Sequence, residues 1–168
     1  LGGSMTAWIV VGILGVAVLT LLWTRGKEPY RHRGIASADL ERFLGVLFDR
    51  GYPNGFMTIR GELTAADPRF VQFALKVDAV GAKRLELAFP LAEWSADYLP
   101  RMEATLTAAQ LAWTRADTPP GGAVRGFLLA GFAGPGEAAR AARLVLEDVL
   151  GFGRECKFEV VFEGVSPN

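Results

Sequence analysis

Residues Phe70–Phe89 read F-V-Q-F-A-L-K-V-D-A-V-G-A-K-R-L-E-L-A-F, and this stretch decides the fold. Apolar and polar side chains alternate over Phe70–Val77 and again over Arg84–Phe89, which is the period-two pattern of strands that place one face on a core. Gly81 lies between the two runs and supports a hairpin. We therefore expect an antiparallel strand pair with one half-exposed face at this point of the chain.

Further strand-like stretches lie on both sides of this hairpin. The upstream one covers Phe56–Leu63. Downstream, Leu111 and Trp113 alternate with polar neighbours, and a turn rich in proline and glycine leads into the nearly apolar Val124–Phe132. This pattern predicts a second hairpin whose second strand is central and buried on both faces. A last strand is expected over Cys156–Phe162.

Three helices are expected among these strands. The clearest follows Ser37, which we expect to cap it, and ends at Gly51. A second covers Leu91–Glu103 and is interrupted near Pro100, and a third covers Gly134–Leu150. The apolar stripe of the first helix comprises Leu40, Phe43, Leu44, Leu47 and Phe48.

The order of these elements predicts an α+β fold. It is one compact domain over residues 37–165, with a mostly antiparallel sheet of about six strands and three helices in the order α-βββ-α-ββ-α-β, and residues 166–168 form a tail. About 130 residues is the common size for a single domain with one core. The predicted fold class also includes a single N-terminal transmembrane helix.

The transmembrane helix is predicted from residues Thr6–Thr24, which carry no charge. At 1.5 Å per residue this segment spans roughly 28 Å, about one hydrocarbon core. Trp8 and Trp23 lie near its two ends, at the expected membrane interfaces. We assign residues 5–24 to the anchor and expect residues 1–4 to be the remnant of an expression tag. The alternatives are a cleaved signal, for which the basic start and the cleavage site are missing, and a buried core helix.

Four basic residues follow the anchor within a stretch, 25–36, that is expected to be a linker. By the positive-inside rule they predict an N-terminus outside and a domain in the cytoplasm, and the arginine-, alanine- and glycine-rich composition suggests a bacterial inner membrane. The same positive charge could contact anionic lipid headgroups. These membrane-interface residues are Arg25, Lys27, Arg31 and Arg33.

Net charge and cysteine content exclude some classes of function. From Gly34 onward there are 14 basic and 17 acidic residues, a net charge of −3, so there is no electrostatic reason to expect a nucleic acid partner. The single cysteine, Cys156, cannot form an intramolecular disulfide, and its parity with Phe158 places it on the core face.

Catalytic and metal-binding constellations are not found in the sequence. The only histidine, His32, lies in the expected linker among arginines, and one His with one Cys cannot supply a zinc site. Glu93 with Asp97, and Glu147 with Asp148, are carboxylate pairs on expected helix faces, where solvated surface is the ordinary interpretation. We expect no catalytic residues, metal ligands or cofactor, and no enzymatic activity.

One glycine-rich loop is a candidate phosphate site. Residues Gly131–Glu137 read G-F-A-G-P-G-E and connect an expected strand to an expected helix, where backbone amides can hold a phosphate. The spacing departs from the dinucleotide pattern, and Glu137 puts negative charge where the anion would lie. A tight strand-to-helix turn accounts for these glycines without a ligand. The candidate residues are Gly131, Gly134 and Gly136.

The sequence therefore predicts a membrane-tethered, non-enzymatic protein-interaction module, an accessory or adaptor subunit of a bacterial inner-membrane assembly. Its expected partners are the membrane and another protein or a second copy of the chain. Two alternatives stay open: a module that lies on an anionic lipid surface, and a domain that binds a phosphorylated small molecule at the Gly131–Glu137 turn.

Overall fold

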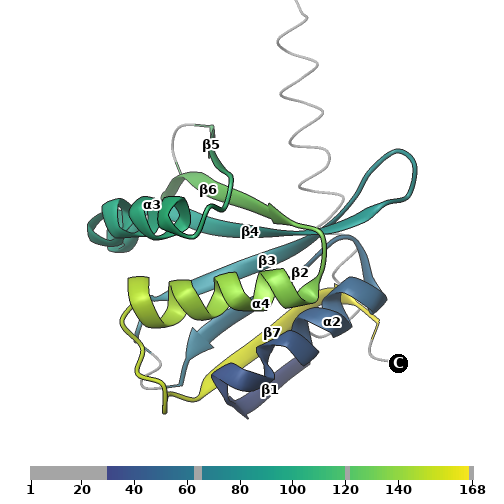
Figure 1. Cartoon of the computed structure of the whole chain (residues 1–168), viewed down its shortest axis with the longest axis horizontal. Helices are drawn as coiled ribbons and strands as arrows, with labels where there is room; N and C mark the ends of the chain where they lie inside the picture. The colour runs from purple at the N-terminus through teal and green to yellow at the C-terminus, as the bar shows by residue number, and fades with distance from the viewer. Residues whose placement is uncertain (1–29, 63–65, 120–121, 167–168) are drawn as a thin grey trace, which may run out of the picture.

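The computed structural model describes residues 30–62, 66–119 and 122–166, which form a two-layer fold with helices over one face of an antiparallel sheet (Figure 1). The seven strands are β1 (Tyr30–Ile35), β2 (Gly51–Gly61), β3 (Phe70–Val77), β4 (Lys83–Ala92), β5 (Trp113–Asp117), β6 (Val124–Phe132) and β7 (Phe158–Val165). The helical elements are η1 (Ser37–Asp39), α2 (Leu40–Arg50), η2 (Glu93–Tyr98), α3 (Leu99–Ala108), α4 (Pro135–Arg143) and the π-helical η3 (Leu144–Val149).

The strands are ordered β1-β7-β2-β3-β4-β6-β5, and every neighbouring pair is antiparallel. The sheet holds seven strands, so the predicted count of about six and the predicted element order are wrong. The additional strand is β1, which lies at the edge of the sheet beside β7 and falls within the stretch expected to be a linker.

Strand β1 was missed because its basic residues masked a period-two pattern. The rings of Tyr30 and His32 lie on the helix side of the sheet, 4.9 and 6.2 Å from the ring of Phe162. Arg31 and Arg33 alternate with them, and both contact a carboxylate on the opposite face. The stretch is therefore an edge strand with one aromatic side and one cationic side.

No helix within residues 30–62, 66–119 and 122–166 has the length and apolar character that crossing a membrane requires. The transmembrane helix of the predicted fold class thus has no counterpart in this part of the chain. The segment for which it was predicted, Thr6–Thr24, lies outside the described residues, as do Arg25, Lys27 and the expected tag remnant at 1–4.

The hairpin that decides the fold is confirmed as β3 and β4. Its turn is held by Asp78, whose Oδ1 accepts hydrogen bonds from the backbone N–H groups of Val80 and Ala82 at 3.0 and 2.9 Å. Gly81 has φ of +83°, a conformation that glycine adopts without the steric cost of a Cβ. Sequence chemistry and turn geometry therefore agree at this hairpin.

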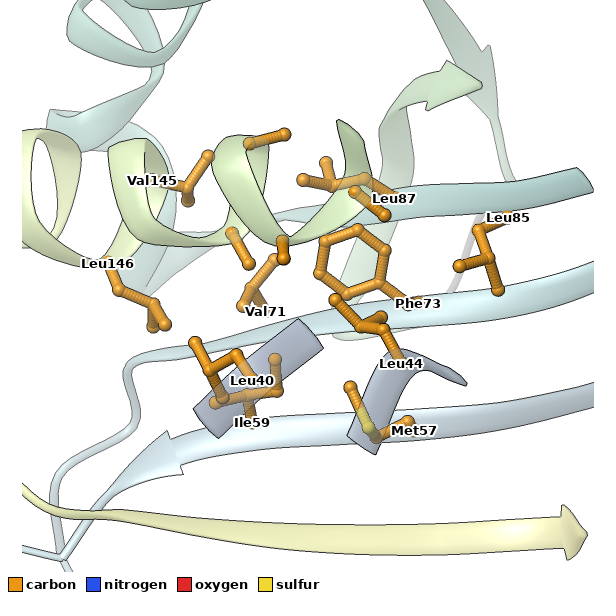
Figure 2. Packing of buried hydrophobic residues seen from close by; sticks show 14 of the residues in the cluster. Leu40, Leu44, Met57, Ile59, Val71, Phe73, Leu85, Leu87, Val145 and Leu146 are labelled. Atoms are coloured by element: carbon orange, nitrogen blue, oxygen red, sulfur yellow. The ribbon is translucent and has the colours of Figure 1, made fainter. Parts of the chain in front are cut away.

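The core lies between the sheet and the helices (Figure 2). Met57, Phe73, Leu87 and Ala130 oppose one another across four neighbouring strands, and the first three are fully buried. Burying a large apolar side chain contributes roughly 1.5–3 kcal/mol, so rows of this kind dominate the stability of the domain. The helices cover these rows with Leu40, Leu44, Val145 and Leu146.

Strand β6 differs from its prediction of burial on both faces. Leu128, Ala130 and Phe132 are buried against the helices, whereas Phe127 and Leu129, on the other face, are only partly buried. The helices α2, α4 and η3 contact one another or the same face of the sheet, and Figure 1 shows α2 and α4 side by side over it. Among the described elements, no layer of helices lies on the opposite face, although Trp94 of η2 reaches it at one end, 5.4 Å from the ring of Phe70, and β6 is fully buried on the helix side only.

The helix boundaries also differ from their predictions. Ser37 does not cap α2; it begins η1, and its hydroxyl donates instead to Glu147 Oε1 at 2.9 Å, which ties the start of the first helix to η3. The second predicted helix is divided near Pro100, as expected: η2 ends at Tyr98 and α3 begins at Leu99. Pro100 lies in the first turn of α3, where a proline removes no intrahelical hydrogen bond. The third predicted helix is α-helical over α4 and continues from Leu144 as the π-helical η3.

Candidate functional site

The glycine-rich loop predicted from the sequence lines a pocket of about 600 Å³ at the start of α4. Ala133, Gly134, Pro135 and Gly136 form one wall, and four charged side chains complete it. These are Glu41 of α2 and Glu137, Arg140 and Arg143 of α4. Two carboxylates and two guanidinium groups leave no net charge, so the pocket has no electrostatic preference for an anion.

Hydrogen bonding within this loop also opposes phosphate binding. Glu137 Oε2 accepts the backbone N–H of Ala133 at 3.3 Å, so the side chain places a carboxylate on the amide that an anion would use. A Cβ added at Gly131 or Gly134 would meet nothing within 4 Å, and neither residue has a positive φ. A tight turn therefore does not require glycine at these two positions, and the fold offers no other steric reason for them.

The carboxylate pairs considered from sequence do not form an acid–base site. Glu93 and Asp97 are exposed on η2. Glu147 is partly buried but accepts the hydroxyl of Ser37, which makes it a structural link between helices. No group of three or more His, Cys, Asp or Glu side chains within the described ranges is placed to hold a metal ion.

His32 and Cys156 are both engaged in packing. The His32 ring lies 5.0 Å from the ring of Phe43 and 5.1 Å from that of Tyr30, so the only histidine belongs to an aromatic cluster on the core side of β1. Cys156 is partly buried beside the core, just before β7. Burial raises the pKa of its thiol, which keeps the sulfur protonated and unreactive at neutral pH.

A partly buried ion pair near Cys156, between Arg69 and Asp67, was not predicted from the sequence. Arg69 contacts Asp67 through its side chain and donates to the backbone carbonyl of Leu150 at 2.6 Å, and its guanidinium lies 4.3 Å from the ring centre of Phe152. The hydrogen bond from Arg69 holds the pKa of Asp67 below its usual value. The contacts join the start of β3 to the end of η3, so this pair stabilises the fold.

The densest group of charges lies on the face of the sheet that the helices leave uncovered. Glu159 in β7 is only 3% exposed, although it points away from the hydrophobic core. Arg33 Nε donates to its Oε1 at 3.1 Å, Arg60 donates to its Oε2, and an Arg31 terminal nitrogen lies 3.9 Å from Oε1. Burial raises the pKa of Glu159, but the hydrogen bonds from Arg33 and Arg60 outweigh it, and the pKa is lowered overall.

This arginine cluster, defined as Arg31, Arg33 and Arg60 around Glu159, combines predicted and unpredicted residues. Arg31 and Arg33 were singled out from the sequence for their place after the predicted anchor. Arg60 and Glu159 were not, because they lie far away in the sequence and only strand pairing brings them together. Trp8, Trp23, Arg25 and Lys27 lie outside the described residues.

The rest of the uncovered face is built from cross-strand rows of side chains. One cross-strand row takes a single residue from each strand, and none of its members is fully buried. In sheet order the row is Arg31, Val161, Thr58, Gln72, Ala88, Leu129 and Thr114. The next row is Glu163, Phe56, Ala74, Glu86 and Gly131. Small, apolar and uncharged polar side chains thus form the middle of the first row. The second row carries Glu163 and Glu86, of which Glu86 pairs with Lys76, and the arginine cluster lies at the β1 end.

Comparison of the chain with known protein families, with curated proteins and with solved structures finds no match.

Proposed function

We propose that this chain is a membrane-tethered, non-enzymatic interaction module, an accessory or adaptor subunit of a bacterial inner-membrane assembly. In this proposal, the segment Thr6–Thr24 anchors the chain, the domain lies in the cytoplasm, and another protein docks on the uncovered face of the sheet. The uncovered face is the single observation that carries the proposal.

The dimensions of this face support a protein partner. Six spacings between seven strands, at about 4.8 Å each, make the face roughly 29 Å wide, and six residues along a strand make it about 20 Å long. The resulting area of roughly 600 Å² in projection approaches the accessible surface that one partner contributes to a standard interface, about 800 Å². Larger exposed apolar patches on a monomeric protein commonly mark an interaction site.

The chemistry of the face defines the partner that fits it. Val161, Ala88 and Leu129 present apolar groups on this face, while Thr58 and Gln72 offer hydrogen-bonding groups between them. A protein with a mainly apolar surface and a few polar groups is complementary to this pattern. The absence of charge in the middle of the row argues against a nucleic acid partner.

The test is extraction of the full-length chain from its host in a gentle detergent, followed by mass spectrometry of the proteins that co-purify. Ala88→Arg places a long cation in the middle of the face, and Ala104→Arg makes the same change on the exposed side of α3. We expect one defined set of membrane proteins with the unchanged chain and with Ala104→Arg, and its loss with Ala88→Arg. Both variants must keep the melting temperature of the unchanged chain.

Three results would contradict the proposal. Co-purification that survives Ala88→Arg would place the partner elsewhere on the molecule. Recovery of the chain alone as a monomer would leave the face without a partner. A dimer of this chain that Ala88→Arg dissociates, with no other protein present, would replace the heterologous partner with a second copy.

A further inference from the structure

We propose that the arginine cluster of Arg31, Arg33 and Arg60 binds the phosphate groups of anionic phospholipids and holds the β1 edge of the sheet against the bilayer. This inference rests on the tether in the proposed function. It assigns a ligand to one end of the uncovered face, separate from the middle of the face that we assign to a protein.

The first step of the argument is charge. Three guanidinium groups surround one carboxylate, which leaves a net charge of +2 in the cluster. Glu62 lies beside β1, where its carboxylate accepts the backbone N–H of Gly34, and counting it still leaves the group positive. One arginine is enough to balance the single negative charge of Glu159. The cluster contains two cations beyond that need.

The second step is accessibility. The side chains of Arg31, Arg33 and Arg60 are 51%, 74% and 43% exposed, whereas that of Glu159 is 4% exposed. Glu159 thus lies beneath the arginines and orients them through Nε of Arg33 and Arg60, while their outer surfaces face water. Guanidinium groups held in this way can bind a phosphate through two parallel N–H donors at a small further loss of side-chain entropy.

The third step is the length of chain between the predicted anchor and the cluster. Only the five residues 25–29 separate Thr24 from Tyr30, the first residue of β1. A fully extended chain advances at most about 3.6 Å per residue, so Tyr30 lies within roughly 22 Å of the end of the anchor. Arg31 follows directly, and Arg25 and Lys27 lie between. An anionic membrane surface attracts basic segments at this range.

Arg60 distinguishes this inference from a simple effect of positive charge after an anchor. It lies in β2, distant from the anchor in sequence, and reaches the membrane-proximal arginines only because β7 lies between β1 and β2. Attraction by the chain next to the anchor does not involve it. A folded lipid site does involve Arg60. For this reason Arg60→Gln is the decisive substitution.

The experiment uses the full-length chain reconstituted into nanodiscs of phosphatidylcholine alone, or of phosphatidylcholine mixed with phosphatidylglycerol. Amide hydrogen exchange is followed in peptides that cover β1 and β2. We expect several-fold slower exchange of β1 in the anionic discs, reduced by added salt. Arg60→Gln and Arg31→Gln should each abolish this difference. Arg84→Gln, a matched change in β4 outside the cluster, should preserve it.

Fold stability is controlled by the choice of variants and by a second measurement. Arg31 makes the longest contact with Glu159, 3.9 Å, so Arg31→Gln removes a cation with the smallest effect on the buried carboxylate. The melting temperature in neutral detergent identifies any variant that has lost its fold. If Arg60→Gln melts early, Arg60→Lys replaces it: this variant keeps the positive charge but loses the paired N–H donors, so a folded lipid site predicts a reduced difference and simple charge attraction predicts an unchanged one.

Each result decides the inference. Equal exchange of β1 in both kinds of disc, or a difference that survives Arg60→Gln in a protein that keeps its fold, would overturn it. If inorganic phosphate slows the exchange of β1 in neutral discs as much as anionic lipid does, the cluster binds free phosphate. That result would overturn the assignment to lipid.

Extraction of the vesicles with alkaline carbonate tests separately whether the chain is anchored in the membrane. Chain that resists extraction but exchanges alike in both lipids refutes the lipid site and leaves the tether intact. Chain that carbonate removes refutes the tether. In that case, flotation in buffer with anionic but not neutral vesicles, lost in Arg60→Gln, supports the lipid site, and flotation with neither overturns it.

Discussion

Arg60 and Glu159 occupy directly opposed positions on the neighbouring strands β2 and β7, and the Arg60 guanidinium binds the Glu159 carboxylate across a sequence separation of 99 residues. Because Glu159 is almost fully buried on a face without helices, its carboxylate depends on arginines for nearly all of its polar contacts. This dependence makes the pair a sensitive test of how the sheet is held together.

We expect Arg60→Gln and Glu159→Gln to be coupled. Each single change leaves a charged group with fewer partners, and each should lower the free energy of unfolding by about 1–3 kcal/mol, toward the lower end because Arg60 is partly exposed to water. The double variant should lose less than the sum, with a coupling of about 0.5–3 kcal/mol. Denaturant unfolding of the full chain in neutral detergent measures all four proteins, and strictly additive losses would contradict the pairing.

Acid should destabilise the domain through Glu159 and Asp67. Arginine contacts lower the pKa of both carboxyls in the folded chain, so the unfolded chain binds protons first as the pH falls. Their stabilising contribution is complete above the ordinary pKa values of 4.5 and 3.8, and it decreases as the pH falls toward the lowered values. The melting temperature should therefore fall with pH below about 5. Glu159→Gln and Asp67→Asn should each flatten this dependence; an unchanged slope in both would count against it.

Two phenylalanines on opposite faces of the sheet should respond very differently to truncation. Phe73 is fully buried beneath the helices, and Phe73→Ala should cost about 3–5 kcal/mol of unfolding free energy. Phe56 lies on the uncovered face and is only partly buried, so Phe56→Ala should cost less than about 1.5 kcal/mol. Thermal and denaturant unfolding compare the two, and equal losses would mean that the uncovered face is not a surface of the isolated domain.

Two glycines of β6 form a similar matched pair. A Cβ at Gly126 would lie 2.5 Å from the backbone oxygen of Ala116 in β5, so Gly126→Ala must displace an edge strand and should cost roughly 1–3 kcal/mol. A Cβ at Gly131 would meet nothing within 4 Å, so Gly131→Ala should leave the melting temperature within about one degree. Similar behaviour of the two variants would mean that β5 does not pair closely with β6.

The strands that pattern alone could identify are those buried on one face by large side chains. In β3, Val71, Phe73 and Leu75 alternate with smaller or polar residues, and the strand has the boundaries that this alternation predicts. Strand β1 could not be recognised in this way, because Arg31 and Arg33 owe their place in a strand to Glu159, 126 residues away from Arg33. Pairing between strands that are distant in the sequence cannot be recognised from the local pattern of apolar and polar residues.

The candidate site was only partly foreseeable for the same reason. The place of Arg31 and Arg33 after the predicted anchor pointed to a membrane role, but Arg60 looked like an ordinary polar residue of a strand. Glu159 gave one signal that could have been used, since it is the one acid among the otherwise apolar residues 158–162 of β7. A lone charge inside a strand of this kind requires a cationic neighbour, and that requirement predicts a basic strand beside β7.

The position of β7 between β1 and β2 has a consequence for how the protein is made. A ribosome delivers the apolar N-terminal segment and β1 long before it delivers β7, and β1 has no other neighbour in the sheet. Strand β1 therefore stays unpaired through most of translation, and its aromatic side stays uncovered until β7, one of the last segments, is synthesised. If the N-terminal segment enters the bilayer as soon as it is synthesised, the membrane surface becomes the compartment in which the sheet closes.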